Sequence, residues 1–271
     1  MKNRFSLKDK VIVVTGGTGV LGEAFINGIT DAGGTVCIIG RNDKIATERT
    51  ANILNRGGNA IALIADVTDK QQLLHARDKI LTEYGKIDGL VNAAGGNIPD
   101  AVLQSEQDIF QLNIPALQQV MHLNLFGSIM PTQIFGEAIK KNGAGSIVNI
   151  SSITSQLAVT KVLGYSLAKA AIDSYTKWFA VELAKRFGDK IRMNAIAPGF
   201  FLTKQNKTLL TNDNGSLTER GNLVINKTPF SRFGNPEELI GALVWLLSNA
   251  SKFVTGTILK VDGGFSVYSG V

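Results

Sequence analysis

The sequence is poor in the residues that build disulfides and metal sites. Its 271 residues include one cysteine, Cys37, and two histidines, His75 and His122. A single cysteine excludes an intramolecular disulfide, and because Cys37 lies in an apolar stretch we expect a buried, unreactive thiol. Neither histidine is accompanied by a cluster of cysteine, histidine or carboxylate residues at metal-ligand spacing, so no metal site is predicted.

Long runs of a single residue type are also missing. No apolar stretch approaches the roughly 18 residues of a membrane-spanning helix, and no secretory apolar region is seen near the amino terminus. The formal net charge is +6, yet lysine and arginine are scattered and no basic run of five residues occurs. We therefore expect a cytoplasmic protein with neither a membrane nor a nucleic acid as its partner.

No linker, charge block or internal repeat divides the chain, so we expect a single domain over residues 1–271. Strand-like runs alternate with helical patterns, which indicates an α/β fold with a parallel sheet covered by helices on both faces. Ligands of such sheets bind beyond the carboxyl ends of the strands. The seven predicted strands are Val11–Thr15, Thr35–Ile39, Ala60–Ala65, Gly89–Asn92, Ser146–Ile150, Arg192–Ile196 and Thr257–Val261.

A glycine-rich turn follows the first predicted strand. Residues Thr15 to Gly22 read T-G-G-T-G-V-L-G, and an apolar-periodic helix continues to about Ala32. Glycine permits positive φ and close backbone approach, while the free N–H groups and the positive dipole end of a helix attract phosphate groups. The turn therefore predicts binding of a pyrophosphate.

A second group of residues suits proton transfer to or from a carbonyl oxygen. Tyr165 and Lys169 form a Y-x-x-x-K pair, Ser152 precedes the tyrosine by thirteen residues, and Asn124 completes a quartet. Residues 164–187 read as a helix, on which positions i and i+4 share one face. A phenol titrates near pH ~10 and transfers protons poorly at neutral pH unless a nearby cation stabilises its phenolate. Lys169 is placed to supply that cation.

The motifs together resemble the short-chain dehydrogenase/reductase family over nearly the whole chain. The matching segments are T-G-G-T-G-V-L-G, A-D-V, N-A-A-G, N-I-S-S, Y-S-L-A-K, I-R-M-N-A-I-A-P-G and V-D-G-G. The resemblance implies a single doubly wound Rossmann-type domain and hydride transfer between a nicotinamide cofactor and a carbonyl or alcohol. It also implies a homotetramer, with the long helices around 115–141 and 164–187 as its packing faces.

The resemblance assigns a role to each member of the quartet. Tyr165 is expected to be the general acid in reduction and the base in oxidation. Ser152 would hold the reacting oxygen by a hydrogen bond, and Asn124 would organise a water link between the lysine and bulk solvent. Lys169 would bind the nicotinamide ribose hydroxyls and lower the pKa of the tyrosine.

The resemblance also implies the cofactor contacts. The middle glycine of the family's turn is replaced by Val20, and we expect Gly17 and Gly19 to supply the missing freedom. Arg41 stands where NAD-preferring members often carry an acidic residue, and a guanidinium can clamp a 2′-phosphate, so NADP(H) is favoured over the alternative NAD(H). Asp66 is expected at the adenine edge. The full set is Gly16, Thr18, Gly19, Val20, Leu21, Gly22, Arg41, Asp66, Val67, Asn92, Ala93, Ala94, Gly95, Tyr165, Lys169, Pro198, Gly199 and Thr203.

For the substrate, the stretches N-A-A-G-G-N-I-P-D-A and D-I-F-Q-L-N-I-P and an insert at about 200–233 resemble the branch containing D-mannonate oxidoreductase, or fructuronate reductase. An anionic sugar acid is therefore expected. The insert is expected to form a mobile lid, because its polar content gives it little to pack. Candidate substrate contacts are Asn97, Gln156, Lys161, Lys204, Lys207, Arg220 and Lys227.

Other functions stay open at this point. A related reductase of a gluconate-type, 3-ketoacyl or steroid-like carbonyl would keep the same quartet and line its lid differently. A non-catalytic dinucleotide-binding protein would keep the glycine turn and lose Tyr165 or Lys169, both of which are present.

Overall fold

The computed structural model describes residues 4–104, 106–203 and 206–270. At its centre lies a sheet of seven strands, all paired in parallel, in the order β3-β2-β1-β4-β5-β6-β7. The prediction of a parallel sheet is confirmed, and each strand lies within two residues of its expected bounds. The strands are β1 (Val11–Thr15), β2 (Thr35–Gly40), β3 (Asn59–Ile64), β4 (Gly89–Asn92), β5 (Gly145–Ile150), β6 (Ile191–Pro198) and β7 (Ile258–Val261).

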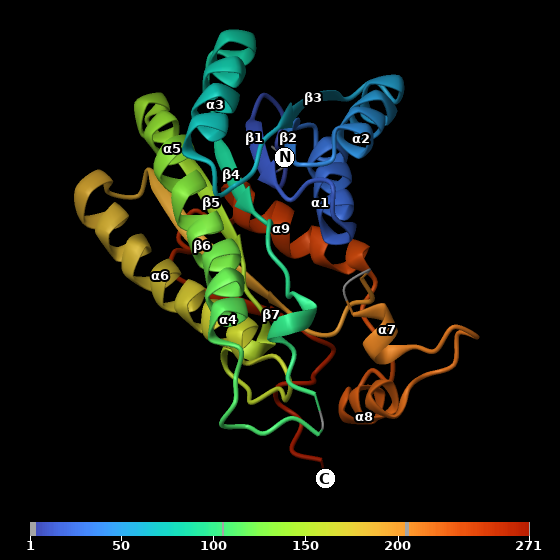
Figure 1. Ribbon diagram of the computed structural model, residues 1–271. Helices are drawn as coiled ribbons and strands as arrows, with labels where there is room; N and C mark the ends of the chain where they lie inside the picture. Colours follow the sequence, from blue (N-terminus) through green and yellow to red (C-terminus); the bar gives the residue numbers. More distant parts are fainter. Residues whose placement is uncertain (1–3, 105, 204–205, 271) are drawn as a thin grey trace.

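Helices cover both faces of the sheet (Figure 1). One face carries α1 (Val20–Asp31), α2 (Asp43–Asn55) and α9 (Ile240–Leu247). The opposite face carries α3 (Lys70–Tyr84), α5 (Gly127–Asn142) and α6 (Leu163–Phe187), with α4 (Ile114–Met121) leading into α5. The shorter helical elements are η1 (Pro99–Ala101), η2 (His122–Phe126), η3 (Ile153–Ser155), η4 (Pro236–Leu239) and η5 (Asn249–Ser251), together with α7 (Lys207–Leu210) and α8 (Glu219–Lys227).

The apolar runs of the strands are explained by burial on both faces. In β1, Ile12 and Val14 contact the core under α1 and α9, while Val11 and Val13 contact the core under α3, α5 and α6. A strand covered on both sides needs apolar residues at every position, so it reads as a continuous run. Cys37 of β2 is fully buried, as expected, and burial raises the pKa of its thiol.

The long helix expected around residues 115–141 is not regular. Helices α4 and α5 are separated by η2, a π-helical turn over His122–Phe126. Such a turn inserts an extra residue into the helix, and π-turns occur frequently at functional sites. This one holds Asn124, whose side chain is fully buried.

The insert at 200–233 packs better than its composition suggests. Leu210 of α7 and Val224 of α8 are buried in a small apolar cluster with Ile153 and Phe265. The expectation that this segment has little to pack is therefore wrong, because a few apolar positions within a polar sequence suffice to anchor it. The predicted motion of the lid stays a prediction.

Among the residues described above, none of the helices combines the length and apolarity that crossing a membrane requires.

Candidate active site

Loops from six strands meet at one edge of the sheet. All strands are parallel, so their carboxyl ends lie together, and the strand order reverses between β1 and β4. The predicted site residues follow these ends: the glycine turn after β1, Arg41 after β2, Asp66 after β3, Ala93 to Gly95 after β4, Ser152 after β5 and Gly199 after β6.

Helix α6 brings the tyrosine and lysine together. The Lys169 Nζ atom lies 5.3 Å from the centre of the Tyr165 ring, which confirms that the two side chains share a helical face. Lys169 is almost fully buried, and its ammonium group donates a hydrogen bond of 2.7 Å to the carbonyl oxygen of Ile150 at the end of β5. This bond fixes α6 against the strand that precedes Ser152.

Burial dominates the ionisation of both groups. Burial raises the pKa of Tyr165 to about 12, and a hydrogen bond with Ser152 opposes this shift. Burial lowers the pKa of Lys169 to about 8, opposed by the negative charge of Asp173. The expected lowering of the tyrosine pKa by Lys169 stays a prediction.

The loop that carries Ser152 is tied to α6 by a buried carboxylate. Asp173 accepts hydrogen bonds from the hydroxyl groups of Ser151 and Ser155, the latter at 2.6 Å, and from the Gln156 amide at 3.3 Å. It thereby fixes Ser152 relative to Tyr165. Sequence reasoning missed Asp173, because a carboxylate on a helix ordinarily reads as a solvated surface residue.

Asn124 is fixed by a set of backbone contacts. Its Oδ1 accepts from the Gly96 N–H at 3.0 Å, and its Nδ2 donates to the carbonyl oxygens of Gly96 and Val120 at 2.7 and 2.8 Å. A Cβ atom on Gly95 would lie 2.5 Å from Asn124 Oδ1 and 3.6 Å from Lys169 Nζ. The loop after β4, the π-turn and the lysine therefore meet at Gly95.

The glycine turn is held in a tight conformation. Gly16 has a φ of +67°, and a Cβ atom there would lie 2.7 Å from the backbone of Ala93. A Cβ on Gly22 would lie 2.2 Å from the carbonyl oxygen of Gly16. Thr15, which was not singled out from the sequence, pins the same junction by accepting hydrogen bonds from the Ala93 and Ala94 amides at 3.1 and 3.2 Å.

The role expected of Gly17 and Gly19 needs correction. Neither is among the positive-φ residues, so neither replaces the missing middle glycine by left-handed freedom. Gly17 is required for packing, because a Cβ there would lie 2.8 Å from the Ile38 side chain. Val20 is the first residue of α1 and Leu21 follows it, so a side chain is tolerated at this helical position.

The second and third strands place an opposite pair of charges at the edge. Arg41 Nη1 lies 3.5 Å from Asp66 Oδ2, and the arginine side chain is 74% exposed. Burial opposes ionisation of Asp66, but hydrogen bonds from Thr68 and the nearby Arg41 outweigh it and lower the pKa of the carboxyl group. Thr18 of the glycine turn is adjacent, because a Cβ on Gly40 would lie 2.6 Å from its Oγ1.

The remaining residues expected to bind the cofactor lie at the carboxyl edge of the sheet in different surroundings. The Asn92 amide group lies in a buried network, donating to Thr132 and Asn149 at 2.9 and 2.8 Å, so its side chain supports the sheet. Val67 is buried. Pro198 ends β6, and Gly199 lies so close to Asp262 that a Cβ would be 2.7 Å from its Cα. Thr203 follows, its amide bonded to Asn206 at 2.8 Å.

The comparisons with known proteins agree with this geometry. A family model described as enoyl-(acyl carrier protein) reductase matches residues 19–266. An uncharacterized oxidoreductase, UxuB, of Bacillus subtilis is 41% identical over 275 residues, covering 98% of both chains.

The chain belongs to the short-chain dehydrogenase/reductase family. It is an NAD(P)-dependent oxidoreductase, which excludes the non-catalytic alternative.

Two solved structures of this family superpose closely. One is a Haemophilus influenzae protein proposed to be a D-mannonate oxidoreductase, with bound NAD, at 39% identity and a TM-score of 0.89, covering 98% of each chain. The other is a gluconate 5-dehydrogenase of Burkholderia cenocepacia in complex with NADP and tartrate, at 30% identity and a TM-score of 0.87, with the same coverage. The predicted Rossmann-type fold is confirmed.

The residues that the sequence suggested as substrate contacts of this short-chain dehydrogenase/reductase have different surroundings in the structure. Arg220 of α8 donates to the Thr160 hydroxyl and carbonyl oxygens at 3.1 Å, and Lys227 Nζ lies 5.4 Å from the centre of the Phe265 ring. Asn97 has a buried Nδ2 atom without a hydrogen-bond partner. Gln156 faces Asp173, Lys161 has a φ of +73°, Lys207 begins α7, and Lys204 lies outside the described residues. No cluster of three potential metal ligands occurs within the described ranges.

Proposed function

We propose that this chain interconverts a keto-sugar acid and its alcohol, namely D-fructuronate and D-mannonate, with Tyr165 as the residue that transfers the proton. The observation that carries the proposal is the meeting of Tyr165, Ser152 and Lys169 beside the glycine turn at the carboxyl edge of the sheet. This arrangement provides a proton donor, an oxygen-binding hydroxyl and a cation around one point.

The glycine turn fits a dinucleotide. Gly16 and Gly22 leave no room for a Cβ atom, because the neighbouring backbone lies too close to them. The first amides of α1 have no partner within the helix and can donate to a phosphate. When bound, the nicotinamide supplies or accepts the hydride. We assign Gly16, Thr18 and the first turn of α1 to the pyrophosphate side, and Pro198, Gly199 and Thr203 to the nicotinamide side.

In the reductive direction, the chain's own residues act on the carbonyl oxygen. Ser152 donates a hydrogen bond to that oxygen, and Tyr165 transfers its phenolic proton to it. The charge of Lys169 stabilises the resulting phenolate, and its ammonium group binds the ribose hydroxyls of the cofactor. Asn124, held by the π-turn, connects the lysine to solvent through water and so restores the proton.

The cofactor proposed is NADP(H), with NAD(H) as the alternative. Arg41 is free to leave Asp66, because an exposed ion pair of this length contributes little stability, typically about 0–1 kcal/mol. A phosphate would give the guanidinium two charged oxygens in fork geometry. The neighbouring Thr18 hydroxyl adds a hydrogen-bond donor at the same place.

A polar substrate is supported by unfilled hydrogen-bonding capacity near the quartet. Asn97 Nδ2 and Thr154 Oγ1 are buried without partners, on the loops after β4 and β5. Buried polar atoms are normally hydrogen-bonded, so a hydroxyl-rich ligand is expected there. The relatives proposed or named as sugar-acid oxidoreductases support the same class, and the gluconate 5-dehydrogenase makes a keto-gluconate the second candidate.

The test is a substrate panel followed by nicotinamide absorbance. D-fructuronate, 5-keto-D-gluconate and a 3-ketoacyl thioester are each reduced with NADPH and with NADH, and D-mannonate is tested in oxidation. We expect the highest kcat/KM with D-fructuronate and NADPH. Rapid turnover of the thioester with an inactive fructuronate would refute the sugar-acid proposal, and equal kcat/KM with NADH would refute the cofactor preference.

Two further expectations belong to the same proposal. A homotetramer is proposed from the family resemblance, and the exposed stripe of apolar residues on α6 supports one of its interfaces. The cytoplasmic location and the lid at 200–233 stay predictions from the sequence.

A further inference from the structure

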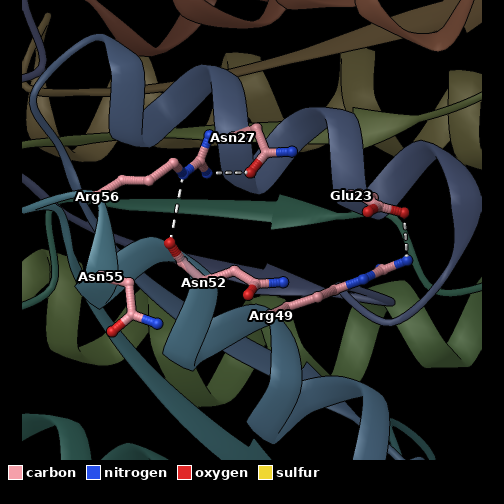
Figure 2. A pocket seen from close by; sticks show the side chains of 6 residues that line it. All are labelled: Glu23, Asn27, Arg49, Asn52, Asn55 and Arg56. Atoms are coloured by element: carbon pink, nitrogen blue, oxygen red, sulfur yellow. Dashed lines mark hydrogen bonds and ion pairs between the residues drawn. The ribbon is translucent and has the colours of Figure 1, made fainter.

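An arginine outside the expected site holds the glycine turn from behind. Arg49 lies on α2, and its Nη1 atom donates hydrogen bonds to the carbonyl oxygens of Gly17 and Gly19 at 2.6 and 2.8 Å. Its Nη2 atom donates to Glu23 of α1 at 2.6 Å. Figure 2 shows Arg49 extended along α2 toward Glu23, across a hollow of about 390 Å³ between the two helices. One guanidinium group thus joins α2, the turn and α1.

These bonds determine which way the peptide groups of the turn face. In a trans peptide the C=O and the following N–H point in opposite directions. The carbonyl groups of Gly17 and Gly19 point at Arg49, so the amides of Thr18 and Val20 point away from it. Those amides lie at the start of α1, where a helix offers its N–H groups to an anion.

The contact is largely shielded from solvent. The Arg49 side chain is only 14% exposed, and the two Nη atoms of its planar guanidinium serve the carbonyl oxygens and the carboxylate at the same time. Gly19 O also accepts the first helical hydrogen bond of α1, from Glu23 N at 3.0 Å. Where the family's middle glycine is replaced by Val20, the turn is therefore held by a side chain from outside it.

We propose that Arg49 is a positioning residue for the cofactor: it orients the peptide groups of the glycine turn so that their amides receive the pyrophosphate. This inference rests on the proposed assignment of the turn to the pyrophosphate. Arg49 would not touch the cofactor itself, because it lies at the carbonyl ends of these peptide groups and the pyrophosphate is proposed at their amide ends.

Arg56 provides a matched control. It directly follows the last residue of α2, about two helical turns beyond Arg49, lines the same hollow, and donates to Asn27 at 2.7 Å and to the Asn52 carbonyl at 3.3 Å. It makes no bond to the glycine turn. Replacing it removes one guanidinium from the same surface and leaves the turn carbonyls paired.

The experiment measures dissociation constants of NADPH and ADP-ribose, which carry the pyrophosphate, and of adenosine, which does not. Arg49→Gln is expected to weaken the first two about tenfold, since hydrogen bonds to charged groups are the strong ones, and to change adenosine binding less than twofold. Arg49→Lys keeps the charge but loses the fork of the guanidinium, so its affinity for NADPH and ADP-ribose should lie between those of the wild type and Arg49→Gln. Arg56→Gln should match the wild type. At saturating cofactor, kcat and the substrate KM should change less than twofold in Arg49→Gln.

Thermal unfolding of each variant separates positioning from folding. Unchanged NADPH affinity in Arg49→Gln, or an equal loss in Arg56→Gln, would overturn the role of Arg49. If Arg49→Gln does not fold, the test relies on Arg49→Lys. Wild-type NADPH affinity in folded Arg49→Lys would then contradict the role proposed for the guanidinium of Arg49. If the wild type itself binds neither NADPH nor ADP-ribose, the assignment of the turn fails together with this inference.

Discussion

Tyr165 is kept protonated by its surroundings, with a pKa raised by burial to about 12. A phenol in that state is ready to donate in the reductive direction. Tyr165→Phe removes the hydroxyl group and keeps the ring, so we expect kcat to fall by about 10³-fold, within the usual range for a general acid. The dissociation constant of NADPH should change less than twofold. Stopped assays with high enzyme concentration measure the residual turnover, and fluorescence titration measures the binding.

A second tyrosine on the same helix serves as the control. Tyr175 packs in the core between α5 and α6, its ring centre 5.2 Å from that of Phe179, and burial raises its pKa to about 12 as well. Tyr175→Phe should retain nearly full kcat. Comparable activity in the two variants would remove Tyr165 from the mechanism.

Lys169 sets the expected pH dependence. Burial lowers its pKa to about 8, so the ammonium group is lost as the pH rises through about 8, while Tyr165 stays protonated. The cation that stabilises the phenolate is then missing. Because kcat/KM reports groups of the free enzyme, reductive kcat/KM should be level below about pH 8 and fall above it. Rates in buffers from about pH 6 to 10 measure this; a level profile to pH 10 would contradict it.

The Lys169→Arg variant tests the origin of that decline. Its guanidinium keeps its charge throughout this range, so whatever activity remains should show no fall near pH 8. A decline at the same pH in the variant would assign the titration to another group.

The role of a single residue could be predicted from the sequence when its partners lie close to it in the chain. Tyr165 and Lys169 could be paired in advance because helical spacing alone brings them together. Asp173 and Arg49 could not, because their partners, the Ser151–Gln156 loop and the glycine turn, are distant in sequence. The burial of Tyr165 could not be read from the sequence for a similar reason, since its desolvation depends on the packing of the whole site.

At the scale of elements, the junction of β1 and α1 tolerates no side chain at Gly22. A Cβ there would lie 2.2 Å from the Gly16 carbonyl oxygen, so α1 would have to move away from the turn. We expect Gly22→Ala to weaken NADPH binding at least tenfold and to lower the free energy of unfolding by about 1–3 kcal/mol, as overpacking typically does. Titration of NADPH and urea unfolding measure the two effects.

Gly241 of α9 is the matched helical control. A Cβ there meets nothing within 4 Å, so Gly241→Ala should keep wild-type affinity and leave stability unchanged or raise it by up to about 1 kcal/mol. Wild-type NADPH affinity in Gly22→Ala would show that the close approach is not needed for the cofactor.

The elements themselves were predictable to different degrees. Strands buried on both faces are continuous apolar runs, and all seven were found within two residues. The π-turn at Asn124 was not foreseen, because its sequence, H-L-N-L-F, lies inside a stretch that reads as one helix and the Gly96 contacts of Asn124 join residues distant in sequence. The packing of the insert at 200–233 was missed because Leu210 and Val224 are buried with Ile153 and Phe265, which lie elsewhere in the chain.

For the whole molecule, the parallel order of the sheet turns six separate loops into one site. Each motif was readable alone, but the turn, the quartet and Arg41 reach the same edge because all seven strands are parallel, and the strand order reverses between β1 and β4 at that edge. The substrate is the part that this architecture determines least, because the insert at 200–233 and the loop after β4 can change their side chains without altering the sheet.

The surface of α6 leads to a prediction about assembly. Leu163, Leu167, Trp178 and Val181 are each at least 43% exposed. At about 100° per residue, their spacing places all four within about 60° of one another on the helix. A contiguous apolar stripe of this kind marks a protein interface, and a helix face that meets its own copy across a two-fold axis closes without leaving edges. One such contact pairs two copies, and the tetramer that the family resemblance implies needs a second contact, for which the helices around residues 115–141 are the proposed face. With both contacts formed, we expect sedimentation velocity to show a tetramer.

Trp178→Glu should break that assembly, because it places a charge in the middle of a buried apolar contact. Smaller species should appear in sedimentation velocity, while far-ultraviolet circular dichroism stays unchanged. Leu54→Glu is the control: Leu54 is an apolar residue of α2 with 50% exposure, away from this stripe, and its variant should remain tetrameric. A wild-type monomer, or dissociation of both variants, would show that the stripe on α6 does not hold the subunits together.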